Sequence, residues 1–462
     1  MKVNIAGYNI DKSLIDSLES KLATPEVISA AYARISRSSK SVTDLRQEAL
    51  LEIDKARKSN QNIIFEMGHS SIAEHAVFNL DIIDVSRLLT DTIESIRLAS
   101  FTEKSQRYVT LKHDYVIPAE LQNHPLENEF KSLVQKLFAE YQACFEALKE
   151  SYSNAFPELS KRDLEGKAKE DARYILPLAT KSQMGLTINA RSLENLLRKL
   201  DANPLTEAQE LHSILSSKLS SISPSLLRYT SSESYSCKPL DLSVLHKSAP
   251  EKIGELSLLD YSPDPDDRIL AAMLYPESSL SFESCLNIVK ALTQTDKDNL
   301  WQQVWCGMNA WHKVSRAFEQ AELSFECTMS ESCWAQFKRH RLSSMQKSIK
   351  CSSIPLIIPQ AIRELGRESI WQELWQQSQA LGANLEQIKP GLGSYIRLNL
   401  DRVKVLVKMN FRELYHFVRL RSDEHAQWEI RRLSQRLTLE LKPIAPHALQ
   451  ELCGKSEFSQ KH

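Results

Sequence analysis

The chain has 462 residues, roughly two to three times the usual length of one domain, so we expect two domains. Lys and Arg number 58 against 59 Asp and Glu, which excludes a protein that binds nucleic acid or a membrane surface through a large basic excess. The 8 cysteines form no CxxC pair of the kind that zinc sites and redox dithiols use, and no apolar run reaches the ~18 residues of a membrane span. We therefore expect a soluble cytoplasmic protein with no metal site.

Helical and strand patterns both occur along the chain. In chain order, residues 70–80 show helical spacing of apolar residues, residues 77–83 alternate like a strand, and residues 126–148 and 208–219 return to helical spacing. In the second half, residues 323–329 alternate like a strand. The mixture predicts an α+β fold, with two competing patterns over residues 77–80.

Glycine is scarce, at 11 residues. The close pair Gly391 and Gly393 is not followed by a third glycine that opens a helix, so neither a dinucleotide fingerprint nor a phosphate loop is present. Any nucleotide must be held in another way.

Several short segments recur in the same order, as in a duplicated chain. Residues 189–193 (NARSL) correspond to residues 410–414 (NFREL), and residues 73–76 (AEHA) to residues 318–321 (FEQA). The stretch from Ser86 to Leu98 has its counterpart in a segment that ends at Leu342. Two diverged copies of one unit are predicted.

A stretch rich in Pro, Ser and Asp separates the two copies, with a turn cluster at residues 262–265. We predict an N-terminal domain over residues 1–237 and a linker with the start of the second unit over residues 238–267. The C-terminal domain then covers residues 268–462.

One candidate anion site lies in the second copy, where Arg339, His340 and Arg341 follow Gln336. Arginine suits phosphate because its planar fork donates two parallel charge-assisted hydrogen bonds. A solvated basic helix face explains this segment equally well. The first copy has no such cluster at the equivalent place.

A second candidate lies in the first copy, where residues 100–108 (SFTEKSQRY) offer a carboxylate, hydroxyls and a guanidinium in one short stretch. These groups suit contacts to a sugar, a base and a phosphate. Taken alone, the stretch is better explained as a polar loop.

The order of these segments resembles the flavin-dependent thymidylate synthases. The first half carries the resemblance at residues 69–75 (HSSIAEH), 86–87, 100–108, 173–177 (RYILP) and 189–193. The second half carries it at Gln336, 339–341, Asn410, Arg412, Arg421 and 425–430 (HAQWEI). The resemblance implies two tandem domains, each a helix-rich unit packed on a small sheet.

The resemblance also implies a nucleotide site and a flavin site. Deoxyuridine monophosphate (dUMP) would be bound by Gln336, Arg339, Glu103, Lys104, Ser105, Gln106, Arg107, Arg173 and Arg421. FAD would be bound by His69, Ser71, Glu103, Asn189, Arg191, Asn195, Arg339, His340, Arg341, Asn410 and Arg412. Because Val314 stands near the place of His69, and His416 at that of Asn195, we expect one working flavin site per chain.

Family members are ordinarily homotetramers of one domain, and two subunits share each dUMP site. In this chain, each half keeps only one of the two sets of dUMP residues. The second half alone keeps Gln336, Arg339 and Arg421, where the first has Thr92, Ser95 and Leu200. The first half alone keeps Glu103, Ser105, Arg107 and Arg173, where the second has Lys347, Ile349, Cys351 and Ser394. One complete composite site is kept and its mirror image is lost, which favours an active enzyme over random decay.

By resemblance, Arg421 would be the catalytic residue, because a fixed positive charge favours a uracil ionised at N3. FAD reduced by NADPH would mediate transfer of the methylene carbon of methylenetetrahydrofolate. No cysteine lies in the retained motifs, and Ser105 reads as a ligand contact because it has no adjacent base. His69 and His340 could carry protons, but orienting hydrogen bonds explain them better.

Two other functions remain open at this point. A flavin- or nucleotide-binding pseudoenzyme of the same fold is the main alternative. A purely structural, partner-binding helical protein is the other. For the enzyme we expect dUMP and folate as small-molecule partners, no nucleic acid, no membrane, and a homodimer that forms a pseudo-tetramer.

Overall fold

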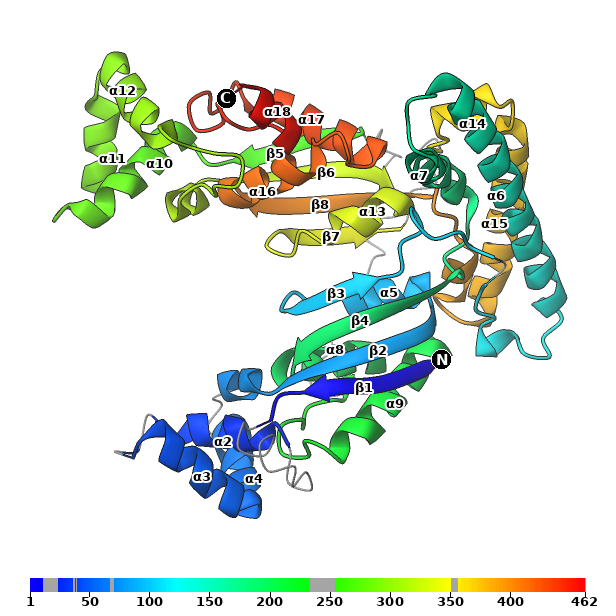
Figure 1. Cartoon of the computed structure of the whole chain (residues 1–462), viewed down its shortest axis with the longest axis horizontal. Helices are drawn as coiled ribbons and strands as arrows, with labels where there is room; N and C mark the ends of the chain where they lie inside the picture. The colour runs from blue at the N-terminus through cyan, green and yellow to red at the C-terminus, as the bar shows by residue number, and fades with distance from the viewer. Residues whose placement is uncertain are drawn as a thin grey trace, which may run out of the picture. The chain divides into compact units, whose positions relative to one another are not determined.

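The computed structural model describes residues 1–10, 24–35, 38, 40–66, 70–112, 114–232, 254–349 and 356–461 (Figure 1). Packing divides the chain into two units. Unit 1 comprises residues 1–244 and 358–399, and unit 2 comprises residues 245–357 and 400–462. Each unit combines helices with one antiparallel sheet, which confirms the predicted α+β class.

Unit 1 is built on a four-stranded sheet with the order β1-β2-β4-β3. Its strands are β1 (Lys2–Tyr8), β2 (Val77–Ser86), β3 (Ala99–Glu103) and β4 (Lys181–Asn189). Alternate residues of β2, among them Phe78 and Leu80, are buried against α8 (Ala190–Asp201) and α9 (Thr206–Ser220). The strand pattern therefore prevails at residues 77–80, where the helical pattern competed. The helix predicted at residues 208–219 is confirmed as α9.

The other elements of unit 1 surround this sheet. Before β2 lie α2 (Glu26–Ile35), α3 (Val42–Leu51), α4 (Ile53–Gln61), η2 (Asn62–Glu66) and η3 (Ser70–His75). Between β2 and β4 lie α5 (Arg87–Glu94), η4 (Ala119–Leu121), α6 (Glu127–Ala155), α7 (Lys161–Ala172) and η5 (Arg173–Ile175). The later segment adds α14 (Gln360–Glu364), α15 (Glu368–Ile388) and η10 (Leu392–Ile396).

Unit 2 repeats the sheet with the order β5-β6-β8-β7. Its strands are β5 (Leu256–Tyr261), β6 (Glu322–Ser330), β7 (Ser344–Ser348) and β8 (Arg402–Asn410), and β6 confirms the strand predicted at residues 323–329. The helices are α10 (Pro265–Leu274), η8 (Tyr275–Glu277), α11 (Phe282–Ala291), α12 (Gln294–Trp305), η9 (Arg316–Gln320), α13 (Glu331–Phe337), α16 (Phe411–Arg421), α17 (Trp428–Leu441) and α18 (Lys455–Lys461). The buried faces of α16 and α17 share one hydrophobic core with the sheet.

Equivalent hydrogen bonds fix the register of the repeat. Ser86 pairs with Lys181, caps α5 and donates its backbone N–H and hydroxyl to Glu207. In unit 2, Ser330 pairs with Arg402, caps α13 and donates the same two groups to Glu429. Because these serines are equivalent, Gln336 and Thr92 lie at the same helix position, six residues after the cap.

Residues 358–399 belong to the second copy by sequence but pack in unit 1. Trp371 Nε1 donates to the buried Glu140 carboxylate of α6 at 2.9 Å, and Arg367 forms an ion pair with the same group. The backbone N–H of Leu178 donates to the Arg397 carbonyl at 2.7 Å. The packing boundary therefore falls inside the C-terminal domain predicted over residues 268–462. Of the linker and start of the second unit predicted over residues 238–267, residues 238–253 lie outside the described residues.

Candidate active site

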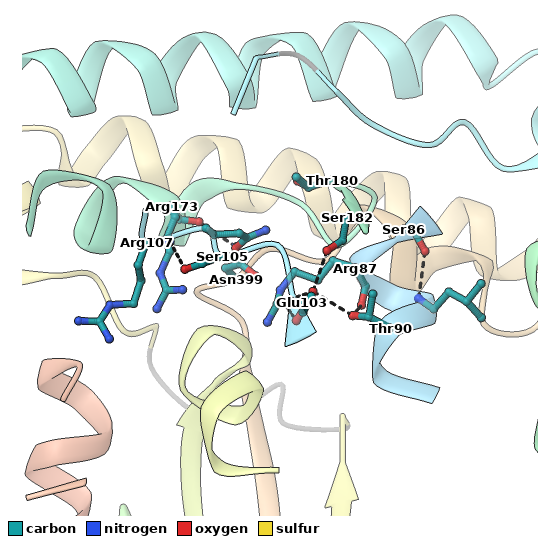
Figure 2. A network of polar contacts seen from close by, with 12 residues as sticks. Ser86, Arg87, Thr90, Glu103, Ser105, Arg107, Arg173, Thr180, Ser182 and Asn399 are labelled. Carbon is teal, nitrogen blue, oxygen red and sulfur yellow. Dashed lines mark hydrogen bonds and ion pairs between the residues drawn. The ribbon is translucent and has the colours of Figure 1, made fainter. Parts of the chain in front are cut away.

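Glu103, at the end of β3, is held by three side chains (Figure 2). Arg87 Nη1 lies 3.2 Å from its carboxylate, and the hydroxyls of Thr90 and Ser182 donate to it at 3.3 and 2.9 Å. The side chains of Arg87 and Glu103 are only 8% and 3% exposed. The carboxylate is thus fixed and charge-compensated inside unit 1.

The stretch 104–110 follows Glu103 and carries four more of the predicted dUMP residues, from Lys104 to Arg107. The backbone N–H of Lys104 donates to the Gln183 carbonyl at 2.9 Å, which extends the pairing of β3 with β4. The backbone N–H of Arg107 donates to the Ser105 hydroxyl at 3.2 Å. These hydrogen bonds, donated by backbone N–H groups, fix the backbone conformation at the start of the polar stretch.

Arg107, within this stretch, and Arg173, the first residue of η5, both lie to the left of Ser105 in Figure 2, and their side chains extend the same way. Arg107 Nε forms an ion pair with Glu170 at 2.7 Å. Arg173 is buried, its Nε donates only to the Glu170 backbone carbonyl at 3.3 Å, and its Nη2 has no hydrogen-bond partner among the described residues. Burial lowers the pKa of Arg173, and the charges of Arg107 and Arg87 act in the same direction, against Tyr174 and Glu170. A buried guanidinium whose Nη2 lacks a hydrogen-bond partner is suited to bind an anion.

Asn399 is a residue of this site that sequence reasoning missed. It comes from the second copy, is fully buried, and donates from Nδ2 to Gln106 Oε1 at 3.0 Å and to the Arg173 carbonyl at 2.9 Å (Figure 2). The register of the repeat puts Leu178 at the equivalent position of the first copy. One sequence feature could have identified Asn399: it is a polar residue at a position where the first copy has leucine.

We expect Asn399→Leu, which copies Leu178, to lower the free energy of unfolding by about 1–3 kcal/mol for each buried acceptor left unpaired. Thermal unfolding of the purified chain measures the change. The control is Asn299→Leu on the exposed side of α12, which should leave the midpoint unchanged. Equal midpoints for the two variants would contradict the role given to Asn399.

In unit 2, Gln336, His340 and Arg421 meet at the end of α13, Gln336 through its backbone carbonyl. Arg421 Nε donates to His340 Nε2 at 2.9 Å, and its Nη2 donates to the Gln336 carbonyl at 3.2 Å. The Gln336 Nε2 amide is buried and has no hydrogen-bond partner among the described residues. Arg339 and Arg341 flank the buried His340 and are both exposed.

Next to these residues, His340, Glu413 and His416 place three metal-ligand atoms within 4.8 Å of one another. His340 Nδ1 lies 3.3 Å from Glu413 Oε1. A neutral imidazole that binds a metal through one nitrogen carries its proton on the other. His340 Nε2 must instead accept the N–H of Arg421, so the arrangement favours a hydrogen-bond chain over a metal site.

The predicted flavin residues of the first copy gather at the start of α8. Asn189 caps this helix by accepting from the Ser192 backbone N–H at 2.8 Å, and Arg191 forms an ion pair with Glu74 of η3. Ser71 and Asn195 are exposed, on η3 and one turn further along α8. His69 lies outside the described residues.

The second copy keeps the same arrangement. Asn410 caps α16 by accepting from the Glu413 backbone N–H at 2.9 Å, and Arg412 forms an ion pair with Glu319 at 2.9 Å. Each unit therefore presents a capped helix start with an arginine held by a glutamate from the preceding 3-10 helix.

The ion pair at Glu103 has an inverted counterpart in unit 2. The register places Glu331 at the position of Arg87, and Lys347 at that of Glu103. Lys347 Nζ lies 2.8 Å from the Glu331 carboxylate, so both charges are exchanged while the pair is kept. The register thus agrees with the predicted Lys347 at the position of Glu103, whereas Cys351 lies outside the described residues.

Unit 1 also contains a cavity of about 430 Å³. Thr92 and Ser394 both line it, together with Leu88, Leu205 and Lys199. Thr92 stands at the position of Gln336, and Ser394 lies eight residues before β8, as Arg173 lies eight before β4. The resemblance assigns both positions to contacts with one nucleotide. In unit 1 both positions line the same cavity, and their residues, Thr92 and Ser394, are uncharged.

Comparisons with known proteins agree with this duplicated architecture. A family model described as "Thymidylate synthase complementing protein" matches residues 17–225 and again residues 257–447. A UPF0159 protein of Thermoplasma acidophilum is 24% identical, over 90% of this chain and 93% of its own length. A UPF0159 protein of Chlamydia muridarum is 23% identical, over 87% of this chain and 81% of its own.

Proteins named flavin-dependent thymidylate synthase match about half of the chain or less. One from Clostridium tetani is 29% identical, over 45% of this chain and 82% of its own length. One from Nitratidesulfovibrio vulgaris is 34% identical, over 37% of this chain and 68% of its own.

No helix among the described residues is both long and apolar enough to cross a membrane. Because the family model matches both copies of the repeated fold, the chain belongs to the Thy1 family of thymidylate synthase complementing proteins.

Proposed function

We propose that the chain is a flavin-dependent thymidylate synthase that methylates dUMP to thymidylate with methylenetetrahydrofolate and NADPH, through FAD. The observation that carries the proposal is the complementary loss in the two copies. The first copy keeps Glu103, Ser105, Arg107 and Arg173, and the second keeps Gln336, Arg339 and Arg421. Glu103, Arg107 and Arg421 are each held by hydrogen bonds or ion pairs within their unit, as a working site requires.

In this proposal, Arg173 and Arg107 bind the phosphate of dUMP, with Lys104, Ser105 and Gln106 beside them. The unpartnered Nη2 of Arg173 supports this role, because phosphate supplies the acceptors that a buried guanidinium lacks. Glu103 does not neutralise Arg173, since its oxygens are engaged by Arg87, Thr90 and Ser182.

The two retained sets are proposed to serve one nucleotide. Support comes from the degenerate copy within unit 1, where Thr92 and Ser394 line the same cavity. These are the positions of Gln336 and Arg173, one from each copy of the sequence. In this proposal the two positions act together in both copies of the repeat, and only the pair Gln336 and Arg173 has kept the residues that the resemblance assigns to the nucleotide.

Arg421 is proposed to stabilise the uracil ring as the N3 anion, because a fixed guanidinium favours the charged form of a neighbouring group. Ionisation raises electron density at C5, the carbon that receives the methylene group. No thiolate nucleophile is needed. Among the described cysteines, Cys144 and Cys327 are buried, and burial raises the pKa of both thiols, that of Cys144 to about 12.

The residues present fit a flavin at the start of α8. Arg191 is half exposed and paired with Glu74 of η3, and the helix start attracts anionic groups such as a pyrophosphate. FAD, when bound, supplies the redox chemistry and mediates one-carbon transfer. Ser71, Asn189, Arg191 and Asn195 would orient it, with His69, Glu103, Arg339, His340 and Arg341 as the further proposed contacts. Asn410 and Arg412 would form the second, degenerate position.

We further propose that two chains form a homodimer with the layout of a four-domain assembly, since each chain contains two family domains. Light scattering of the purified protein should give twice the 52.7 kDa mass of one chain. A monomer at working concentration would contradict this assembly.

The function is tested by release of tritium from C5 of labelled dUMP, with FAD, NADPH and methylenetetrahydrofolate present and then omitted one at a time. Release that depends on flavin and reductant, with thymidylate as product, supports the proposal. A protein that binds flavin and dUMP but releases no tritium would be a pseudoenzyme of the same fold. A protein that binds neither ligand would remove the basis for the whole assignment.

A further inference from the structure

The guanidinium of Arg421 is held at two points within unit 2. Its Nη2 donates to the Gln336 carbonyl at 3.2 Å, and its Nε donates to His340 Nε2 at 2.9 Å. A guanidinium is protonated at any working pH and can only donate hydrogen bonds. His340 Nε2 must therefore offer a lone pair, and the ring proton of the neutral imidazole must sit on Nδ1.

The Nδ1 proton of His340 faces a carboxyl group. Glu413 Oε1 lies 3.3 Å from Nδ1, and both side chains are only 2% exposed. Burial lowers the pKa of His340, and the charges of Arg421 and His416 act in the same direction, so the ring stays neutral. Burial raises the pKa of Glu413 against the opposing effect of His416, but a carboxyl oxygen accepts the Nδ1 proton whether or not the group is ionised.

The sister copy has lost this chain as a whole. The register of the repeat places Ile96 at the position of His340, Ser192 at that of Glu413, and Leu200 at that of Arg421. The surrounding frame is unchanged, since Asn189 and Asn410 both cap their helices. The three contacting residues are thus present together in one copy and replaced together in the other. This pattern is expected of residues that act together.

We propose that Glu413 is a positioning residue, which fixes the tautomer of His340 so that His340 can orient the Arg421 guanidinium. This inference rests on the proposed function of Arg421. His340 accordingly acts through the guanidinium rather than as a proton carrier. The neighbouring His416 is exposed and is not part of the chain of hydrogen bonds.

The test compares Glu413→Gln with Glu413→Ser. The glutamine amide oxygen can still accept from Nδ1, whereas serine, the residue of the sister copy, is too short to reach it. We expect Glu413→Ser to lower kcat on the order of tenfold to a hundredfold, with flavin content and KM for dUMP changed less. Glu413→Gln should stay within roughly threefold of the unchanged chain, because it restores the acceptor.

A second measurement does not depend on turnover. Nitrogen-15 NMR of histidine-labelled full chain should show the His340 ring protonated at Nδ1, assigned by loss of the signal in His340→Asn. Glu413→Ser should shift this signal towards the tautomer mixture of a free imidazole, and Glu413→Gln should not. Ser192→Ala, the control in unit 1, should leave both the spectrum and kcat unchanged.

The outcomes separate the two proposals. A wild-type His340 protonated at Nε2, or equal spectra and equal kcat for the serine and glutamine variants, would overturn the role of Glu413. If the wild-type chain forms no thymidylate while the Nδ1 tautomer still depends on residue 413, the hydrogen-bond chain stands and the proposed function fails.

Discussion

Replacing Arg421 by Leu, the residue at position 200 in the sister copy, should lower thymidylate formation at saturating substrate by a factor on the order of 10²–10³. The proposed role is stabilisation of the N3 anion, so the loss should appear in kcat. Flavin content should change little, because no proposed FAD contact is removed. Initial rates of tritium release at several dUMP concentrations separate kcat from KM.

Arg436→Leu is the matched control for Arg421→Leu. Arg436 is an exposed arginine of α17 in the same unit, and its partners Glu255 and Glu440 are also exposed or nearly so. Exposed ion pairs contribute about 0–1 kcal/mol, so this variant should keep the turnover of the unchanged chain. If Arg421→Leu retains near-normal kcat, or loses flavin in proportion to activity, the catalytic role of Arg421 is wrong.

Arg173→Met should have the second large effect, and it should act in opposite directions on binding and on stability. Hydrogen bonds to charged groups contribute about 1.5–3 kcal/mol, so KM for dUMP should rise on the order of 10- to 100-fold. Without nucleotide, the midpoint of thermal unfolding should stay equal or rise, because the change removes a buried charge that Arg107 and Arg87 oppose. Steady-state kinetics and thermal unfolding measure the two effects.

The control for Arg173→Met is Arg162→Met, on the exposed side of α7 in the same unit. It should change neither KM nor the unfolding midpoint. A large fall in the midpoint of Arg173→Met, with KM unchanged, would mean that Arg173 serves the fold and not the nucleotide.

The exchange of charges between Arg87–Glu103 and Glu331–Lys347 shows how the copies diverged. An ion pair in a largely buried position is expensive to break at one end, because the remaining charge is left without a partner. Both ends were exchanged, and the pair was kept. The second unit therefore has no carboxylate at the position of Glu103, and no buried charge is left unpaired there.

The sequence by itself determined the elements and the duplication. Alternation over residues 77–83 and 323–329 predicted β2 and β6, and helical spacing over residues 126–148 and 208–219 predicted α6 and α9. These patterns are local consequences of which side chains must be buried. The order of short motifs also led to the prediction that the two copies hold different nucleotide residues.

The tertiary structure alone decided how residues far apart in the chain are combined. Asn399 reaches Gln106 and Arg173 because residues 358–399 of the second copy pack in unit 1. These contacts join residues 293 and 226 positions apart, which no local pattern encodes. The tautomer of His340 likewise follows from Arg421 and Glu413, which meet it only in the folded unit. Hydrogen bonds of this kind depend on direction and on distances near 3 Å, whereas the spacing of residue types along a sequence records only burial and local backbone preference.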